Sequence, residues 1–293
     1  MNYYYDIAGI VLRTEGPAAD LGGIEGFSVF RTRSVEAPSP DITLRTGVAV
    51  ADLQSMPCLK LLHTQEFEGI ECTLWRDAAG TYFFRMSSPE YGTVCFANAA
   101  DGALFESDAG LNGTCPSPIV MRFLVWTAFG MAAVRIGGCP IHSSTIVCDG
   151  KAVLFLGESG TGKSTHTRLW LANIGSSRLL NDDSPVLRII DGRPMAFGSP
   201  WSGKTPCYKK ACAPLAACVR LSQAPHNRIR PLSKIEAFGA LFPSCPPSFA
   251  VDERLTDCVC DILSHVISAV PVYGLECLPD DAAAILAHKT IFG

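Results

Sequence analysis

The feature that most constrains this chain is the octapeptide GESGTGKS at residues 157–164. It fits GxxxxGK(S/T), in which backbone N–H groups surround a nucleotide phosphate, the lysine reaches the outer oxygens and the hydroxyl holds Mg²⁺. Its flanks match this chemistry, because residues 152–156 predict a short buried strand and residues 164–174 a helix ending at Gly175. The positive end of that helix would then point at the phosphates.

We therefore predict that this loop and the next residue bind ATP and Mg²⁺. The predicted nucleotide-binding residues are Gly157, Glu158, Ser159, Gly160, Thr161, Gly162, Lys163, Ser164 and Thr165. Within this set, Lys163 is expected to reach the β- and γ-phosphates and Ser164 to hold the metal ion.

The composition is that of an ordinary globular protein. Of 293 residues, 48% are hydrophobic, which is enough for a sizeable core. A net charge of -4 without a long Lys/Arg run predicts no nucleic-acid partner. The amino terminus does not resemble a secretion signal, and the longest apolar run, residues 123–134, is too short to cross a bilayer. We expect a cytoplasmic protein without a membrane partner.

Cysteine usage points to the same compartment. The count of 13 is odd and the spacings are irregular, so we expect small buried apolar residues in a reducing environment. Cys258 and Cys260 form a CxC, and Cys139 with His142 forms a CxxH, but neither motif has a matching second pair. A structural zinc site is therefore not expected.

Two domains are predicted, with a boundary near residue 112. Residues 1–112 predict a small, mainly antiparallel β domain that shows no chemistry of its own, since short alternating segments are separated by turn signals. Those segments are residues 9–13, 27–31, 70–75, 82–86 and 93–96. Residues 113–293 predict the nucleotide-binding domain, which begins with a long apolar helix over residues 118–135.

The strand before the loop is predicted to belong to a hairpin. An Asp-Gly pair at residues 149–150 separates two apolar, β-branched runs, which is the strongest short hairpin signal. A two-residue turn sets a register that brings His142 opposite Gly157, beside the loop. A structural role and a catalytic role for this histidine remain equal alternatives.

The next strand, residues 178–180, leads into Asp182 and Asp183. A carboxylate at the carboxyl end of a strand neighbouring the loop is where an α/β nucleotide enzyme needs its Mg²⁺ partner or proton acceptor. Paired carboxylates are also common in plain turns. The position one helix after the loop favours the functional interpretation.

A second Asp-Gly hairpin is predicted within residues 186–197. Its register, carried outward, brings Trp201 opposite Asp182. The loop at residues 199–204 would then lie at the mouth of the site, with Trp201 as a lid or stacking platform and Lys204 as a phosphate contact. A packed loop with a surface lysine is the equal alternative.

The remainder alternates strands and helices, as in an α/β domain. Predicted elements are a strand at residues 215–221, a helix capped by Ser233 and Glu236, a helix at residues 251–269, a strand at residues 272–277 and a helix from Asp280. Arg228 and Arg230 are interpreted either as a solvated edge or as contacts for phosphate or carboxylate.

With these residues laid out, the second domain resembles the carboxy-terminal catalytic domain of the HPr kinase/phosphorylase family. The matching features are His142, the phosphate loop and the pair Asp182 and Asp183, in the family's order and at similar spacing. The resemblance is good over residues 138–200 and loose elsewhere. It implies an α/β fold related to phosphoenolpyruvate carboxykinase, with a mixed sheet and flanking helices. The small β domain predicted before it does not look like the amino-terminal region of the HPr enzyme.

The resemblance further implies an ATP- and Mg²⁺-dependent kinase that phosphorylates a hydroxyl of a peptide, a protein serine or a small molecule. Its implied catalytic residues are Asp182 as the base, His142 and Lys163, with Ser164 and Asp183 as metal ligands. The family's Arg/Gly stretches for binding HPr are not found, so we expect a divergent member with another acceptor. Homo-oligomerisation is left open.

Two other interpretations stay open. A regulator or peptide-tailoring partner would bind nucleotide without turnover, while residues 1–112 bind a peptide. The other alternative is an enzyme that carries out only phosphorolysis or nucleotide hydrolysis. Tight nucleotide binding without phosphate release or transfer would favour the regulator.

Overall fold

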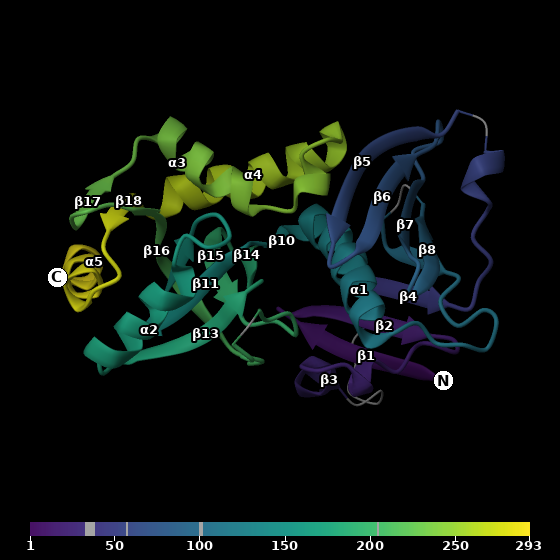
Figure 1. Cartoon of the computed structure of the whole chain (residues 1–293), viewed down its shortest axis with the longest axis horizontal. Coiled ribbons are helices and arrows are strands. Elements are labelled where there is room, and N and C mark those ends of the chain that lie inside the picture. Colours follow the sequence, from purple (N-terminus) through teal and green to yellow (C-terminus); the bar gives the residue numbers. More distant parts are fainter. Residues whose placement is uncertain (33–38, 57, 100–101, 204) are drawn as a thin grey trace. The chain divides into compact units, whose positions relative to one another are not determined.

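Each part of the chain folds around its own β-sheet (Figure 1). The structure, a computed structural model, describes residues 1–32, 39–56, 58–99, 102–203 and 205–293. The chain divides into unit 1, which comprises Met1–Ile136 and Ser248–Leu255, and unit 2, which comprises Gly137–Pro247 and Thr256–Gly293. The long apolar helix, which follows the boundary predicted near residue 112, groups with unit 1.

Over the described residues, the sheet of unit 1 has the order β3-β1-β2-β4-β9-β8-β7-β6-β5. All pairs are antiparallel except β2 with β4 and β4 with β9, so the prediction of a mainly antiparallel region is confirmed. The strands are β1 (Asn2–Ile7), β2 (Ile10–Glu15), β3 (Arg31–Thr32), β4 (Ile42–Thr46), β5 (Lys60–Phe67), β6 (Ile70–Arg76), β7 (Tyr82–Ser88), β8 (Gly92–Asn98) and β9 (Leu104–Ser107). Short 3₁₀ helices occupy Leu21–Gly23 (η1), Phe27–Phe30 (η2) and Leu53–Ser55 (η3).

The strand predicted at residues 27–31 is wrong, because η2 occupies most of it. Gly26 has a left-handed backbone (φ 91°), which turns the chain into the 3₁₀ helix. Phe27 and Phe30 are both fully buried three residues apart, a spacing that puts them on one side of a 3₁₀ turn.

The apolar helix α1 (Pro118–Ala133) continues as the 3₁₀ helix η4 (Val134–Ile136), which confirms the helix predicted here. The Ser117 side chain caps it by accepting from the Val120 N–H, and Phe123 stacks on Phe67 of the sheet (centroids 4.7 Å apart). By length and composition Pro118–Ile136 could cross a membrane, but 67% of its most apolar window is buried inside the protein, as in a core helix.

A distant segment, Ser248–Leu255, joins unit 1 through the buried carboxylate of Asp252. The Tyr82 hydroxyl donates to this carboxylate (2.6 Å), and Arg76 forms an ion pair with it. The same carboxylate accepts from the Arg254 N–H at the start of α4 (Glu253–Ala269). These partners offset the cost of burying the charge and hold the segment to the sheet.

Over the described residues, the sheet of unit 2 has the order β10-β14-β15-β16-β12-β11-β13, with β18 beside β16 and β17 beside β18. It is mixed, since β12–β16 and β16–β18 are parallel pairs and the others are antiparallel. The strands are β10 (Gly138–Pro140), β11 (Ser143–Cys148), β12 (Lys151–Leu156), β13 (Ser177–Asp183), β14 (Val186–Ile190), β15 (Arg193–Phe197), β16 (Cys212–Gln223), β17 (Arg228–Pro231) and β18 (Val272–Cys277). The helices are α2 (Lys163–Asn173), α3 (Lys234–Leu241), most of α4, and α5 (Asp281–Phe292), with 3₁₀ helices η5 (Phe242–Ser244) and η6 (Pro247–Phe249).

Strand β12 is the centre of unit 2, and every residue in it after Lys151 is buried. One core cluster joins β11, β12, β16 and β18 to α2 and α5, with Phe155 against Trp170 (centroids 5.4 Å apart) at its middle. In Figure 1, α3 and α4 lie together above β16, apart from α2. The α/β class and mixed sheet predicted for this part of the chain are confirmed.

Both Asp-Gly hairpins have the predicted register. Cys148 pairs with Lys151 in one, and Ile190 pairs with Arg193 in the other. The turn residues Asp149 and Gly150 have φ of 47° and 77°, as a two-residue turn of this kind requires. Because Ser143 pairs with Leu156, the next positions along the two strands are His142 and Gly157, at the loop edge of the sheet.

Candidate functional site

The phosphate loop, residues 157–164, leads from β12 into α2, as predicted. Gly162 occupies the position that caps α2, with a left-handed backbone (φ 108°) and no side-chain hydrogen bond to the first turn. Most helices use a Ser, Thr, Asp or Asn side chain there to satisfy the first N–H groups. A glycine supplies no capping side chain, so the first N–H groups and the helix dipole can act on a bound anion.

Lys163 lies folded against this loop. Its ammonium donates to the carbonyl oxygens of Gly157 (2.8 Å) and Glu158 (3.1 Å), and the residue is 8% exposed. Burial lowers the pKa of Lys163, while the charges of Asp183 and Asp182 act in the opposite direction. The cation is therefore held against the loop carbonyls, and the charges of the two carboxylates favour its protonated form.

The aspartates reach the same edge through strand direction. Strand β11 lies between β12 and β13 and is antiparallel to both, so β12 and β13 run the same way and end at one edge. The predicted strand is thus not the direct neighbour of β12, because the hairpin partner β11 takes that place. The Ser164 hydroxyl donates to Asp182 Oδ1 (3.0 Å), joining the helix to the end of β13.

The second aspartate faces the histidine. Asp183 Oδ1 lies 3.5 Å from His142 Nε2, and both side chains are about half exposed. Asp183 has φ of 140°, a conformation that L residues rarely adopt and that is concentrated at functional sites. Burial lowers the pKa of His142 and the Lys163 charge adds to this, against the opposite effect of Asp183 and Asp182, so neutral imidazole dominates at neutral pH.

The structure therefore brings together the predicted side chains His142, Lys163, Ser164, Asp182 and Asp183. Ser164 bonds to Asp182, while His142 faces Asp183. The resemblance had implied the pair Ser164 and Asp183 for the metal. A hydroxyl and a carboxylate oxygen 3.0 Å apart are hard ligands of the kind Mg²⁺ prefers, so Ser164 and Asp182 fit this ion.

The loop after β15 lies against the aspartates, as expected, but its register differs. Asp183 bridges Ser202, two positions beyond the projected pairing, since Pro185 and Pro200 interrupt the ladder between the hairpin and the site. The Gly203 N–H donates to the Asp182 carbonyl oxygen (2.6 Å). The extrapolated register was wrong by two residues where proline removes the N–H donor.

Trp201 is 4% exposed, and its carbonyl oxygen accepts from the Asn181 side chain (3.0 Å) and the Ser199 hydroxyl (3.0 Å). This supports the packed loop over the lid or stacking platform. Lys204 lies outside the described residues.

A cavity of about 550 Å³ opens beside the loop. Its walls are the loop at Gly160, the first turns of α2, and the chain after β18. Leu169, Leu221 and Leu278 give it an apolar lining, with Thr165 and Gln223 among its polar groups. An apolar cavity beside a phosphate site suits a nucleotide base. The wall after β18 was missed from the sequence, since it lies more than 100 residues from the loop and carries no motif.

His166, on α2 beside this cavity, is 3% exposed. The Trp170 indole N–H donates to His166 Nε2 (3.1 Å), so the neutral ring carries its proton on Nδ1, which has no partner among the described residues. Burial lowers the pKa of His166 to about 4.

A pH dependence of stability follows from His166. The unfolded residue binds a proton below its ordinary pKa of 6.5, and the folded residue only below about 4. The unfolded state therefore binds more protons in this window, and lowering the pH from 6.5 to 4 should cost about 3 kcal/mol of unfolding free energy. Urea unfolding between about pH 7.5 and 4.5 measures it.

The matched variant is His166→Gln, whose side-chain oxygen can still accept from Trp170 but does not titrate. We expect its stability to fall less steeply with acid than that of the natural protein. Equal slopes in the two proteins would contradict a neutral buried His166.

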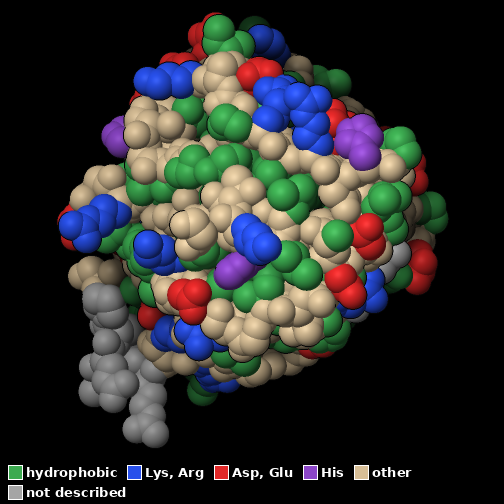
Figure 2. All heavy atoms as spheres, turned by 90° about the vertical axis from the view of Figure 1, so that its left-hand side faces the viewer, with side chains coloured by type: hydrophobic (Ala, Val, Ile, Leu, Met, Phe, Trp, Pro, Cys, Tyr) green, Lys and Arg blue, Asp and Glu red, His purple; other side chains and the backbone are tan. Residues whose placement is uncertain are grey.

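A second cavity, of about 350 Å³, is lined by Arg220, Arg228 and Arg230 together with acidic residues. Arg230 pairs with Glu236 (2.9 Å), and Arg220 lies 3.6 Å from the exposed Glu158 of the loop. On the face shown in Figure 2, basic and acidic side chains are likewise interspersed. The arginines predicted at residues 228–230 thus lie at a cavity edge of mixed charge.

No protein-family model matches this chain, and no curated protein matches it. Among solved structures, the Hpr(Ser) kinase/phosphatase from Coxiella burnetii is similar to it at 13% sequence identity. The match covers 51% of this chain and 86% of that chain, with a TM-score of 0.28. It is a distant structural relationship.

Proposed function

We propose that unit 2 is a phosphate-loop kinase of the HPr-kinase-like type, which transfers the γ-phosphoryl group of ATP to a hydroxyl and uses Mg²⁺. The observation that carries this proposal is the convergence of five side chains at one sheet edge. Ser164 and Asp182 form an oxygen pair at 3.0 Å, Lys163 lies across the loop, and Asp183 faces His142 at 3.5 Å. The exposed Asp183 supplies the general base that transfer to a hydroxyl requires.

In this proposal the two aspartates have separate roles. Ser164 and Asp182 hold Mg²⁺, which supplies charge neutralisation for the phosphates when bound. Asp182 is 6% exposed and close to the loop, whereas the Asp183 side chain is 50% exposed. Asp183 is therefore the carboxylate that an incoming hydroxyl can reach.

The transfer uses these groups as follows. Lys163 leaves the loop carbonyls and binds the β- and γ-phosphate oxygens. Asp183 accepts the proton of the acceptor hydroxyl, whose oxygen bonds to the γ-phosphorus as the bond to the ADP oxygen breaks. His142, neutral and beside Asp183, orients that carboxylate without neutralising its charge.

Incubation with γ-labelled ATP, Mg²⁺ and a panel of acceptors tests the proposal. The panel holds serine- and threonine-containing peptides and small hydroxyl compounds. We expect label on an acceptor and release of ADP. Tight ATP binding without label transfer or ADP release across the panel would favour the nucleotide-binding regulator, and ADP release with label only in free phosphate would favour hydrolysis.

The base-binding role of the 550 Å³ cavity gives a separate prediction. Leu278→Glu places a charge in its apolar wall and should weaken ATP binding about 10-fold or more, measured by calorimetry. Tripolyphosphate, which has no base, should bind the variant as it binds the natural protein. Leu171→Glu makes the same change at an exposed position of α2 outside the cavity and should bind ATP normally. Equal loss for ATP and tripolyphosphate would place the base elsewhere.

A further inference from the structure

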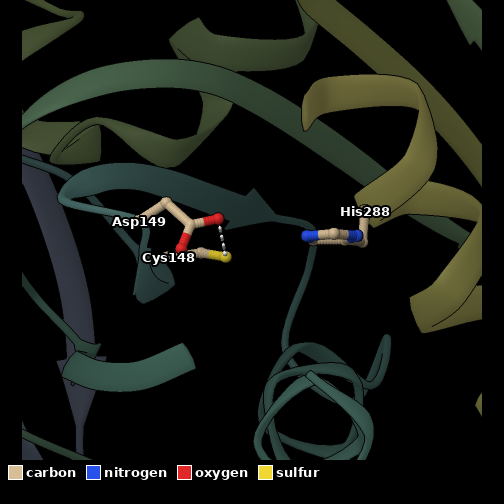
Figure 3. A group of neighbouring side chains, drawn as sticks. All are labelled: Cys148, Asp149 and His288. Atoms are coloured by element: carbon tan, nitrogen blue, oxygen red, sulfur yellow. Dashed lines mark hydrogen bonds between the residues drawn. The ribbon is translucent and has the colours of Figure 1, made fainter. Parts of the chain in front are cut away.

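Three potential metal ligands converge at the sheet edge opposite the phosphate loop. Cys148 ends β11, Asp149 begins the hairpin turn, and His288 lies on α5. Among the described residues, one group of three such side chains has its ligand atoms within 4.8 Å of one another, and it is this one (Figure 3). The CxxH and CxC motifs of the sequence are not part of it.

Two of the three side chains, Cys148 and His288, are held in place by their surroundings. Cys148 is fully buried, with its sulfur 3.6 Å from Asp149 Oδ2 and 3.2 Å from the Ser176 hydroxyl. The His288 ring packs between Trp170 (centroids 5.6 Å) and Phe292 (5.5 Å). Figure 3 shows one ring nitrogen of His288 facing the sulfur and the carboxylate.

We propose that Cys148, Asp149 and His288 bind Zn²⁺. Sulfur, nitrogen and carboxylate oxygen form a donor set that suits this ion. A thiolate and a carboxylate neutralise its two charges, and the imidazole binds as a neutral ligand. The thiol proton of Cys148 passes to solvent as the sulfur binds.

The geometry needs only a small adjustment. Zinc ligand atoms lie about 3.5 Å apart in a tetrahedral site, so the 4.8 Å limit of this group requires closure by about 1 Å. Asp149 is exposed, so its side chain has room to turn toward the sulfur and the packed His288 ring. The fourth position falls to water or to the neighbouring Ser176 hydroxyl.

The site is structural and separate from phosphoryl transfer. Cys148 lies five residues along β11 from Ser143, which is about 17 Å from the loop edge. The metal would join the β11–β12 turn, on one side, to the carboxy-terminal helix α5, on the other. Its consequence is therefore the stability of unit 2.

Metal titration of chelator-stripped protein tests the proposal, with Zn²⁺ for stoichiometry and Co²⁺ as a spectroscopic probe. The exposed cysteines Cys58, Cys115 and Cys212 are replaced by Ser in all samples, so that their thiols give no signal. We expect one equivalent of zinc, tetrahedral Co²⁺ bands and a thiolate-to-cobalt charge-transfer band. With zinc at about 100 times its Kd, the Tm should rise by about 5–10 °C.

Variants assign the ligands. Asp149→Asn keeps a residue that tolerates the left-handed turn, and His288→Gln is a partly exposed change, so both should fold. Each should weaken zinc binding by about 10-fold or more and lose the Tm shift. Cys148→Ser changes a buried residue, so its zinc binding is interpreted only if its far-UV circular dichroism spectrum matches that of the natural protein.

The control is His226→Gln, which removes an exposed histidine paired with Glu276 and should bind zinc normally. Zinc binding that His288→Gln and Asp149→Asn leave unchanged would overturn the proposal. So would Co²⁺ spectra without the thiolate band. If the natural protein proved to have no kinase activity, the test of the zinc site would still stand, because it measures metal binding and Tm.

Discussion

Asp183→Asn should lower the rate of phosphoryl transfer by about 10²–10⁴-fold while changing ATP affinity little. The amide has nearly the shape of the carboxylate but cannot accept the proton of the acceptor hydroxyl. The residue lies at the exposed side of the site, 3.5 Å from His142. Single-turnover transfer from labelled ATP gives the rate, and calorimetry gives the affinity.

Asp182→Asn should behave differently, because Asp182 accepts from Ser164 at 3.0 Å. The change removes a charged metal ligand, so we expect a higher Mg²⁺ requirement and weaker binding of the Mg²⁺-nucleotide complex. The control is Asp191→Asn, the same substitution in a hairpin turn at the far end of β14. It should leave the transfer rate, the nucleotide affinity and the Mg²⁺ requirement unchanged.

The pair of variants decides between two assignments of the base. One outcome would make Asp182 the base. In it, Asp182→Asn abolishes transfer at saturating Mg²⁺ but binds the Mg²⁺-nucleotide complex normally, and Asp183→Asn transfers at the natural rate. The assignment implied by the family resemblance would then hold in place of the one based on distances.

Local rules made the loop edge of unit 2 predictable from the sequence. Each Asp-Gly turn fixes a register residue by residue, so the place of His142 could be read from a turn seven residues away. The same arithmetic failed at Trp201, because prolines at positions 185 and 200 interrupt the ladder on which it depends. The register of a strand pair can therefore be predicted only as far as its ladder of hydrogen bonds is uninterrupted.

Other features depend on contacts between segments far apart in the chain. The cavity wall at Leu278 and the pairing of Ser164 with Asp182 arise from packing that periodicity does not encode. His288 belongs to the last helix and meets Cys148 only because α5 packs against the core cluster beside α2. The two cysteine motifs visible in the sequence lie elsewhere, so motif spacing pointed away from the ligand group.

Lys163→Met should lower phosphoryl transfer by about 10²–10³-fold or more and weaken ATP binding, because it removes the charge that stabilises the transferred phosphoryl group. The same change should not destabilise the protein. Lys163 is 8% exposed and burial lowers its pKa, so desolvation of the ammonium group costs the folded state free energy. Methionine removes this charge and fills the space of the apolar part of the lysine side chain.

A loss of activity without a loss of stability distinguishes a functional lysine from a structural one. Transfer kinetics and Tm, measured on the same sample, provide both, with Lys234→Met, an exposed lysine at the start of α3, as the control. A lysine present to bind the carbonyls of Gly157 and Glu158 would lower Tm when removed, and transfer would fall only with the folded fraction. A variant with natural Tm and lost transfer shows instead that the loop retains a buried cation for its ligand rather than for its fold.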